Sequence, residues 1–156
     1  LEPFLSGRGF REAVTSRPES NMKFGIRRRE AGSPTRWFDA PSVGYMFHPG
    51  NAYEKDGRIV MDACKYEDPK ALLDDLGTIR AAEMSSGLTA KPYLYEFDLE
   101  AGTCKETKLS EISAEFPRLD DRLVGYENRY GYAATAEPAD GAESLFRRLT
   151  KYDRTS

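Results

Sequence analysis

Two short motifs contain the residues of this chain that are best suited to chemistry. The only histidine, His48, lies in residues 47–54 (FHPGNAYE), and Glu115 begins residues 115–119 (EFPRL), 67 positions later. A neutral imidazole is a common ligand for transition metals. A ligating imidazole usually donates its second ring N–H to a carboxylate, which fixes its orientation and tautomer. The two residues therefore have the types of a metal ligand and its carboxylate partner, although each alone also fits a core histidine or a solvated glutamate.

Composition narrows the class of protein. The chain has 156 residues, of which 39% are hydrophobic and 31% charged, values that suit one soluble domain with a buried core. The formal net charge of −3 gives no electrostatic reason to expect nucleic acid as a partner, and we assign no such role to the arginines at residues 27–29. No apolar run approaches the ~20 residues that cross a bilayer. Cys64 and Cys104 make no disulfide framework and no CxxC motif, which favours a cytoplasmic location.

The two ends of the sequence suggest a piece of a longer protein. The first residue is Leu1, and residues 149–153 have the pattern of a strand that leads into a turn and then stops. We therefore expect residues 1–156 to be a single segment that is incomplete at both ends.

Alternation of apolar and polar residues predicts a protein built mostly of strands. The predicted strands are residues 22–29, 35–38, 43–48, 51–54, 58–66, 93–99, 104–109, 129–133 and 144–152. Asp56-Gly57 is a strong hairpin signal between two of them, and Ala101-Gly102 is a second turn. Both faces of residues 58–66 are partly apolar, which is typical of a strand between stacked sheets.

One helix is predicted after the first hairpin. Asp68 is a good N-cap, Pro69 suits the first helical position, and apolar residues recur at helical spacing to Ile79. We expect this helix to end near Met84, and a further short helix at residues 10–14 within a connecting segment. Repeated hairpins with one short helix predict a mostly antiparallel β fold.

Several motifs in a fixed order resemble the carotenoid cleavage oxygenase and lignostilbene dioxygenase family, also described as the retinal pigment epithelial membrane protein family. Besides FHPGNAYE and EFPR, they are residues 24–26 followed by arginines, residues 36–38 (RWF), 93–99 (YLYEFDL) and 129–132 (RYGY). The resemblance extends from about residue 22 to residue 153. It implies part of a seven-bladed β-propeller with iron on its axis. At the ~40–45 residues of a typical propeller blade, the chain would supply roughly three to four blades.

The resemblance also implies a reaction. Members of this family are non-haem Fe(II) dioxygenases that use O2 to cleave a carbon–carbon double bond of a carotenoid, apocarotenoid or stilbene-type substrate into two carbonyl products. His48 would be one of four imidazoles on the iron, and Glu115 would hydrogen-bond an iron-bound histidine. Three further histidines would have to come from outside this segment, so we expect the chain alone to be inactive. No other catalytic residue is predicted in it.

Other residues and partners follow from the same resemblance. Phe47 is a candidate for lining an apolar tunnel, while Asn51, Tyr53 and Glu54 are expected to serve structure. Arg118 and Arg129 are expected to form ion pairs between blades, and RYGY to serve packing. The partners would be an apolar or aromatic alkene and O2, with membrane contact only through segments outside the chain. The exposed flanks of an excised arc, near residues 93–99 and 22–26, are expected to self-associate.

Two other functions fit the same residues. The first is an isomerase or hydrolase on the same scaffold, with iron as a Lewis acid. The second is a non-catalytic β-propeller-type binding domain, with His48 in its core. Phosphate-binding GxxxxGK[ST], dinucleotide-binding GxGxxG and zinc-binding HExxH motifs are absent from the sequence, and neither a nucleophile elbow nor a cysteine–histidine pair is indicated.

Overall fold

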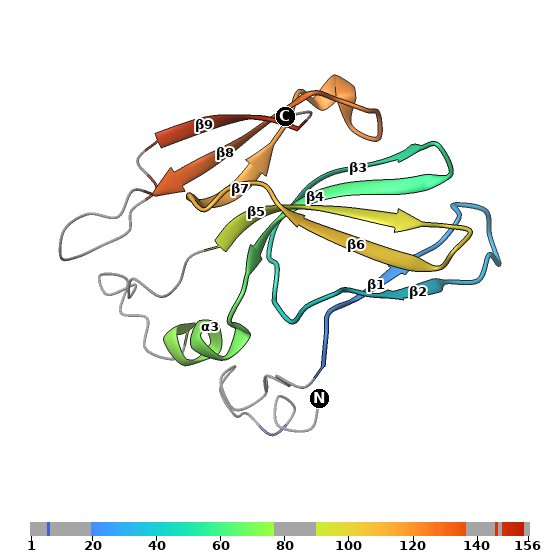
Figure 1. Cartoon of the computed structure of the whole chain (residues 1–156), viewed down its shortest axis with the longest axis horizontal. Helices are drawn as coiled ribbons and strands as arrows, with labels where there is room; N and C mark the ends of the chain where they lie inside the picture. The colour runs from blue at the N-terminus through green and yellow to red at the C-terminus, as the bar shows by residue number, and fades with distance from the viewer. Residues whose placement is uncertain (1–5, 7–19, 77–89, 137–145, 147, 155–156) are drawn as a thin grey trace.

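The computed structural model describes residue 6 and residues 20–76, 90–136, 146 and 148–154. Within these residues, three antiparallel sheets account for the strands (Figure 1). A four-stranded sheet has the order β3 (Pro49–Lys55), β4 (Arg58–Tyr66), β5 (Ala90–Asp98) and β6 (Thr103–Lys108). A three-stranded sheet has the order β7 (Ser113–Arg118), β8 (Tyr130–Ala136) and β9 (Arg148–Asp153). The third sheet pairs β1 (Lys23–Ile26) with β2 (Arg36–Asp39), and the helical elements are α3 (Pro69–Leu76) and the 3-10 turn η1 (Asp121–Leu123).

The two predicted hairpins are confirmed. Asp56 (φ 50°) and Gly57 (φ 74°) connect β3 to β4, and positive φ at both central residues matches the right-handed twist of the flanking strands. Gly102 (φ 71°) lies in the turn between β5 and β6, where Asp98 Oδ1 accepts a hydrogen bond of 2.8 Å from the N–H of Ala101. Both turns are local, so the residues that dictate them are neighbours in the sequence.

The helix begins where its sequence predicts. Asp68 Oδ1 accepts hydrogen bonds from the N–H groups of Lys70 (2.9 Å) and Ala71 (3.0 Å), and Pro69 is the first helical residue. The end predicted near Met84, the short helix predicted at residues 10–14 and the start of the strand predicted at Ser144 lie outside the described residues.

The four-stranded sheet is covered on both faces, because alternate residues of β4 and β5 point to opposite sides. On one side it packs against β1 and β2, with Phe24 ring centroids 4.9 Å from Tyr95 and 5.0 Å from Phe97. On the other side, Cys64 and Tyr66 pack against residues of the β7–β9 sheet. Figure 1 shows this arrangement, with the β7–β9 sheet on one flank of β3–β6 and the β1–β2 pair on the other.

This packing bears on self-association. Alternate apolar side chains of residues 93–99 and 22–26, which were expected to lie bare at blade flanks, belong to one shared cluster and cover each other. Association of chains would therefore have to use other surfaces, and it stays a prediction.

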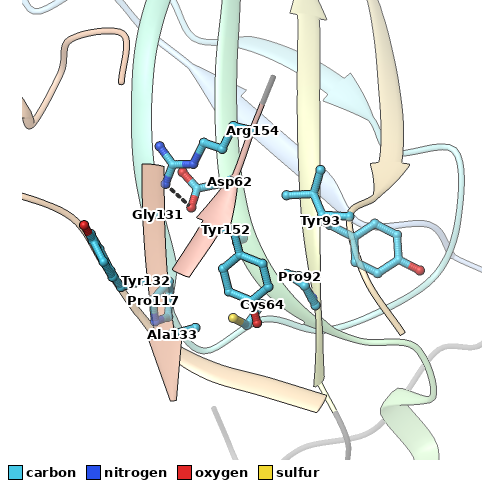
Figure 2. Close-up of a pocket in the computed structure, with 12 residues that line it drawn as sticks. Asp62, Cys64, Pro92, Tyr93, Pro117, Gly131, Tyr132, Ala133, Tyr152 and Arg154 are labelled. Atoms are coloured by element: carbon cyan, nitrogen blue, oxygen red, sulfur yellow. Dashed lines mark hydrogen bonds and ion pairs between the residues drawn. The ribbon is translucent and has the colours of Figure 1, made fainter. Parts of the chain in front are cut away.

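The boundary between the two larger sheets is well filled (Figure 2). Pro92 and Cys64 meet Pro117 and Tyr152 around a cavity of about 20 Å³. A space of this size holds about one water molecule. The two sheets therefore meet closely, and groups that lie across their boundary are held at fixed distances.

The predicted set of strands differs from the structure in two places. Residues 43–48 were predicted as a strand, but only Tyr45 among them forms a bridge, to Tyr66, and β3 begins at Pro49. The segment is irregular because Pro49 has no N–H to donate and a bulge follows it. Strand β7 was not predicted, because its sequence SAEFPR contains a proline and lacks a clean alternation.

In the parts of the chain that the structure describes, no helix is long and apolar enough to cross a membrane.

Candidate metal-binding histidine and its carboxylate

The structure brings His48 and Glu115 together across the boundary between the two larger sheets. His48 directly precedes β3, and Glu115 lies in β7. His48 Nδ1 lies 2.9 Å from Glu115 Oε2. With an ionised carboxylate, this contact makes Nδ1 the protonated nitrogen, which leaves the lone pair of the imidazole on Nε2. The arrangement is that of a metal-binding imidazole held by a carboxylate.

Both residues stand beside a β-bulge. Between the pairs Pro49↔Ala63 and Ala52↔Met61, two residues of β3 oppose the single residue Asp62 of β4. Between Glu115↔Ala134 and Arg118↔Tyr132, two residues of β7 likewise oppose one residue of β8. A bulge bends its strand and redirects the neighbouring side chains. These two irregularities explain how residues from two sheets come to point at each other.

Glu115 is deeply buried and has few partners. Its side chain is 2% exposed, and Oε2 also accepts a hydrogen bond of 2.9 Å from the N–H of Phe116. Oε1 is buried and has no hydrogen-bond partner among the described residues. Burial raises the pKa of the Cys64 thiol to about 12, and the nearby Glu115 charge adds to this increase. Burial and then the Glu115 charge also raise the pKa of Tyr66. The Glu115 carboxylate thus lies in a buried environment that water does not reach, and a cation close to His48 would offset its negative charge.

The imidazole itself is accessible and lies among aromatic rings. The His48 side chain is 47% exposed. Its ring centroid lies 5.0 Å from that of Phe116 and 6.2 Å from that of Phe47, and these two rings are 50% and 40% exposed. Phe116 has φ of 54°, an uncommon value for a residue with a side chain, within the β7 bulge. The ring surfaces beside His48 are therefore apolar and open.

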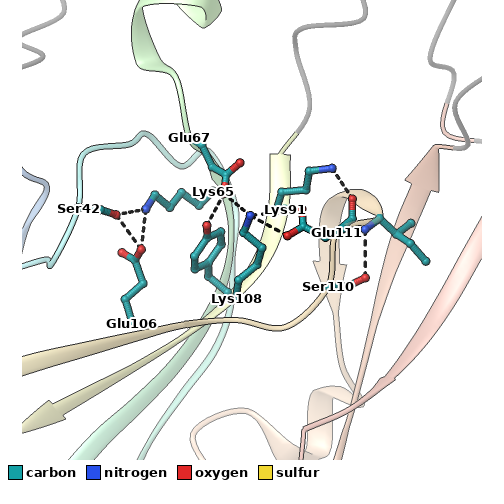
Figure 3. A network of polar contacts seen from close by, with 10 residues as sticks. Ser42, Lys65, Glu67, Lys91, Glu106, Lys108, Ser110 and Glu111 are labelled. Carbon is teal, nitrogen blue, oxygen red and sulfur yellow. Dashed lines mark hydrogen bonds and ion pairs between the residues drawn. The ribbon is translucent and has the colours of Figure 1, made fainter.

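The segment that leads to His48 is fixed to β4 by a buried lysine (Figure 3). Lys65 Nζ donates to Ser42 Oγ and to Glu106 Oε1, the latter at 2.7 Å, and the Lys65 side chain is 2% exposed. Gly44 lies directly on this side chain, where a Cβ would overlap Lys65 Cε. Close approach of the backbone at Gly44 therefore requires glycine.

Backbone hydrogen bonds continue the attachment to β4. Tyr45 and Tyr66 exchange two, of 2.9 and 2.8 Å, and the N–H of Cys64 donates to the carbonyl of His48 at 3.3 Å. Cys64 is thus next to His48 in space, which the sequence did not indicate. Because its pKa is raised to about 12, its thiol stays protonated near neutral pH and makes a poor nucleophile.

Of the motif residues after His48, Asn51 makes structural contacts, as expected. Asn51 is buried, its Oδ1 accepts from the N–H of Gly125 at 3.0 Å, and its Nδ2 donates to Asn128 Oδ1 at 2.8 Å. Asn51 thereby holds the loop around η1 against β3. Tyr53 and Glu54 lie farther along β3, with Glu54 exposed and opposite Ile59.

Of the two arginines expected to form ion pairs between blades, Arg129 pairs within one sheet, and the role of Arg118 stays a prediction. Arg129 pairs with Asp153 across β8 and β9 of one sheet, with 2.7 Å between Nη2 and Oδ2, and Arg118 is exposed. A buried ion pair between sheets joins Asp62 and Arg154, at 2.7 Å. A signal for Asp62 existed in the sequence, because it is a carboxylate on a mostly apolar strand face. Arg154 follows the last predicted strand, and nothing in the local pattern marks it.

In the described parts of the chain, no three His, Cys, Asp or Glu side chains gather where they could hold a metal ion together. The site consists of one imidazole with an available Nε2 and one carboxylate behind it. These two residues fit the role of one ligand in a larger metal site, and further ligands would have to come from elsewhere.

Comparisons with known proteins agree with this fold. A family model described as retinal pigment epithelial membrane protein matches residues 3–156. The chain is 30% identical over 118 residues to carotenoid 9,10(9′,10′)-cleavage dioxygenase 1 of Phaseolus vulgaris, covering 74% of this chain and 21% of that protein. It is 30% identical over 108 residues to lignostilbene-alpha,beta-dioxygenase isozyme III of Sphingomonas paucimobilis, covering 66% of this chain and 21% of that protein.

A solved structure shows the same architecture. The cobalt-substituted ACO of Synechocystis superposes with a TM-score of 0.75 and 25% identity, covering 97% of this chain and 31% of that one. The mostly β fold and its place in a β-propeller are thereby confirmed, and the three sheets agree with the lower end of the predicted blade number. The chain spans about a fifth of the length of the two curated relatives. It belongs to the retinal pigment epithelial membrane protein family, whose relatives include carotenoid and lignostilbene dioxygenases.

Proposed function

We propose that this chain supplies one imidazole ligand and its orienting carboxylate to the Fe(II) site of an alkene-cleaving oxygenase. The observation that carries the proposal is the 2.9 Å contact between His48 Nδ1 and Glu115 Oε2, which leaves Nε2 available. The buried Oε1 without a partner among the described residues supports a nearby positive charge. The remaining ligands would be imidazoles from outside these 156 residues.

Each residue of the site has a distinct task in this proposal. His48 binds the metal through Nε2, and Glu115 accepts a hydrogen bond from Nδ1–H and so keeps the ring in the ligating tautomer. When bound, Fe(II) would activate O2, and both oxygen atoms would enter the two carbonyl products formed from the cleaved double bond. Phe47 and Phe116 present apolar surface beside the imidazole, where they exclude water and contact a flat conjugated substrate.

The substrate class rests on the relatives. Those described above are named for carotenoid cleavage and for lignostilbene, and both names denote conjugated alkenes. The half-exposed aromatic rings beside His48 suit such a substrate better than a charged one. Isomerisation or ester hydrolysis on the same scaffold would consume no O2, so the products distinguish these reactions.

The test uses the intact protein that contains this chain. Replacement of His48 by Ala should remove most of the bound iron, because it deletes a ligand. Glu115→Gln should retain part of the iron and lower activity about 10–100-fold, the usual effect of losing a carboxylate behind a ligand. Glu54→Gln, an exposed glutamate of the same motif, is the matched control and should change neither quantity.

Iron content, O2 consumption and carbonyl products are the measurements. Full iron content and full activity in His48→Ala would show that the histidine is not a ligand. Turnover without O2 consumption would favour an isomerase or hydrolase.

A further inference from the structure

A buried ion pair joins the two larger sheets (Figure 2), and its carboxylate lies opposite the β3 bulge that follows His48. Arg154 Nη2 lies 2.7 Å from Asp62 Oδ2, and the two side chains are 4% and 13% exposed. Asp62 Oδ1 accepts a hydrogen bond of 2.9 Å from the N–H of Asn51, while Arg154 Nη1 donates at 2.7 Å to Asn128 Oδ1. The pair thus joins β4 and the β3 bulge to the β8–β9 side of the neighbouring sheet.

Two glycines make room for this pair. A Cβ on Gly50 would lie 2.8 Å from Asp62 Cγ, and one on Gly131 would lie 2.7 Å from Arg154 Nη2. Neither glycine has a positive φ, so the missing side chain rather than backbone freedom is what these positions require. Both sheets are therefore shaped around the carboxylate and the guanidinium.

The ion pair joins β4, which pairs with β3 after His48, to the residue that follows β9, in the sheet that contains Glu115. Gly50 and Asn51 are the bulge residues of β3, immediately after His48 and Pro49. Gly131 lies in β8, the strand that pairs with β7 beside Glu115. A change in the distance between Asp62 and Arg154 would consequently change the distance between the imidazole and its carboxylate.

We infer that the Asp62–Arg154 ion pair is a positioning device that sets the contact between His48 Nδ1 and Glu115 Oε2. Stability alone gives a poor account of it, because apolar residues of similar volume usually replace a buried ion pair without loss. A charged pair has directional bonds and therefore fixes a separation between sheets that apolar packing leaves adjustable. The inference rests on the proposed function only in taking Nε2 as the ligating atom.

The test exploits the single histidine of the chain. In the metal-free 156-residue chain, labelled with ¹⁵N in histidine, one imidazole gives signals, and their nitrogen shifts report the tautomer. The nitrogen shifts also distinguish a protonated ring from a neutral one, so the tautomers are compared at a pH at which the shifts themselves show a neutral ring. We expect the Nδ1–H tautomer to dominate in the unsubstituted chain. Arg154→Met should lower the ratio of the Nδ1–H to the Nε2–H tautomer at least about tenfold. This is the size of effect expected when the hydrogen bond from Nδ1–H to the charged Glu115 carboxylate is lost.

Three further variants separate positioning from general destabilisation. Gly131→Ala keeps both charges but displaces the guanidinium, and should shift the tautomer in the same direction as Arg154→Met. Arg129→Met removes an exposed ion pair of the same sheet and should leave the tautomer unchanged. Phe38→Leu weakens the core on the opposite side of the four-stranded sheet and should lower the melting temperature without moving the tautomer.

The outcomes are distinguishable. A dominant Nε2–H tautomer in the unsubstituted chain would contradict the site geometry and the proposed function. A dominant Nδ1–H tautomer that persists in both Arg154→Met and Gly131→Ala would overturn the positioning inference and leave the proposed function standing. A shift in Phe38→Leu as large as that in Arg154→Met would also overturn it, because any loss of stability would then have the same effect.

Discussion

Strand β4 carries two buried charges on opposite faces, and they connect different parts of the molecule. Asp62 points to the β7–β9 sheet and pairs with Arg154 there. Lys65, three residues later, points to the other face, where Glu106 of β6 lies 2.7 Å away and Ser42 of the segment before His48 accepts a further bond. One pair crosses a boundary between sheets, and the other stays within one sheet and the segment that covers it.

The difference suggests a division of tasks. The Lys65 pair holds the segment that leads to His48 on its own sheet, where backbone bonds to Cys64 and Tyr66 also hold it. The Asp62 pair acts between sheets, where each hydrogen bond described above involves a side chain. Loss of Lys65 should therefore cost stability with little effect on the site, whereas loss of Arg154 should disturb the site itself.

The largest expected change in stability comes from Lys65→Met. The substitution removes the cation that pairs with Glu106 Oε1, while Oε2 of the same buried carboxylate already lacks a partner among the described residues. The free energy of unfolding should therefore fall by about 3–5 kcal/mol. Adding Glu106→Leu should recover most of this loss, because no buried charge then remains. Urea unfolding measures both effects.

Lys91→Met is the matched control for this prediction. Lys91 pairs with Lys65 in the β4–β5 ladder, but its one hydrogen bond among the described residues is an exposed one, to the carbonyl of Glu111. It should change stability by less than about 0.5 kcal/mol. The division of tasks fails if Lys65→Met shifts the His48 tautomer as far as Arg154→Met does.

A smaller change is expected from Asn51→Ala, on the face between the sheets. The substitution removes side-chain bonds to Gly125 and Asn128 and leaves buried groups unpaired, which should cost about 1–3 kcal/mol. The backbone N–H that Asp62 accepts from is kept, so the His48 tautomer should change less than in Arg154→Met. Asn21→Ala, which removes one partly buried bond to Ala40, should cost less than Asn51→Ala in the same unfolding measurement. Equal losses of unfolding free energy in the two variants would show that the bonds of Asn51 contribute no more to stability than the single bond of Asn21.

The smallest expected effect concerns the two thiols. Burial raises the pKa of Cys64 to about 12 and that of Cys104 to about 11. Cys64 is buried and Cys104 only partly so, so Cys104 should react faster with iodoacetamide. Mass spectrometry of peptides from briefly labelled native chain measures the ratio. Faster labelling of Cys64 would mean that the boundary between the sheets opens readily.

The features that could be predicted from sequence are those whose causes are local. The Asp56-Gly57 hairpin and the Asp68-Pro69 helix start depend on adjacent residues, and both are confirmed. The pairing of His48 with Glu115 was expected only from a family resemblance, since nothing in the local pattern brings residues 67 positions apart together. The Asp62–Arg154 pair spans 92 positions, and neither residue belongs to a recognisable motif. Strand β7 was missed because its bulge breaks the alternation by which strands are recognised.

The bulge in β3 also has a consequence for insertions and deletions. Side chains alternate between the two faces of a sheet along a strand. One extra residue therefore turns the side chains on one side of it to the opposite face. Removal of Gly50 would restore regular pairing with β4 and would rotate the preceding residues by half a period. His48 would then face away from Glu115, although every residue of both motifs except one glycine would be retained. The number of residues between His48 and Ala52 is therefore as much a determinant of the site as their identity.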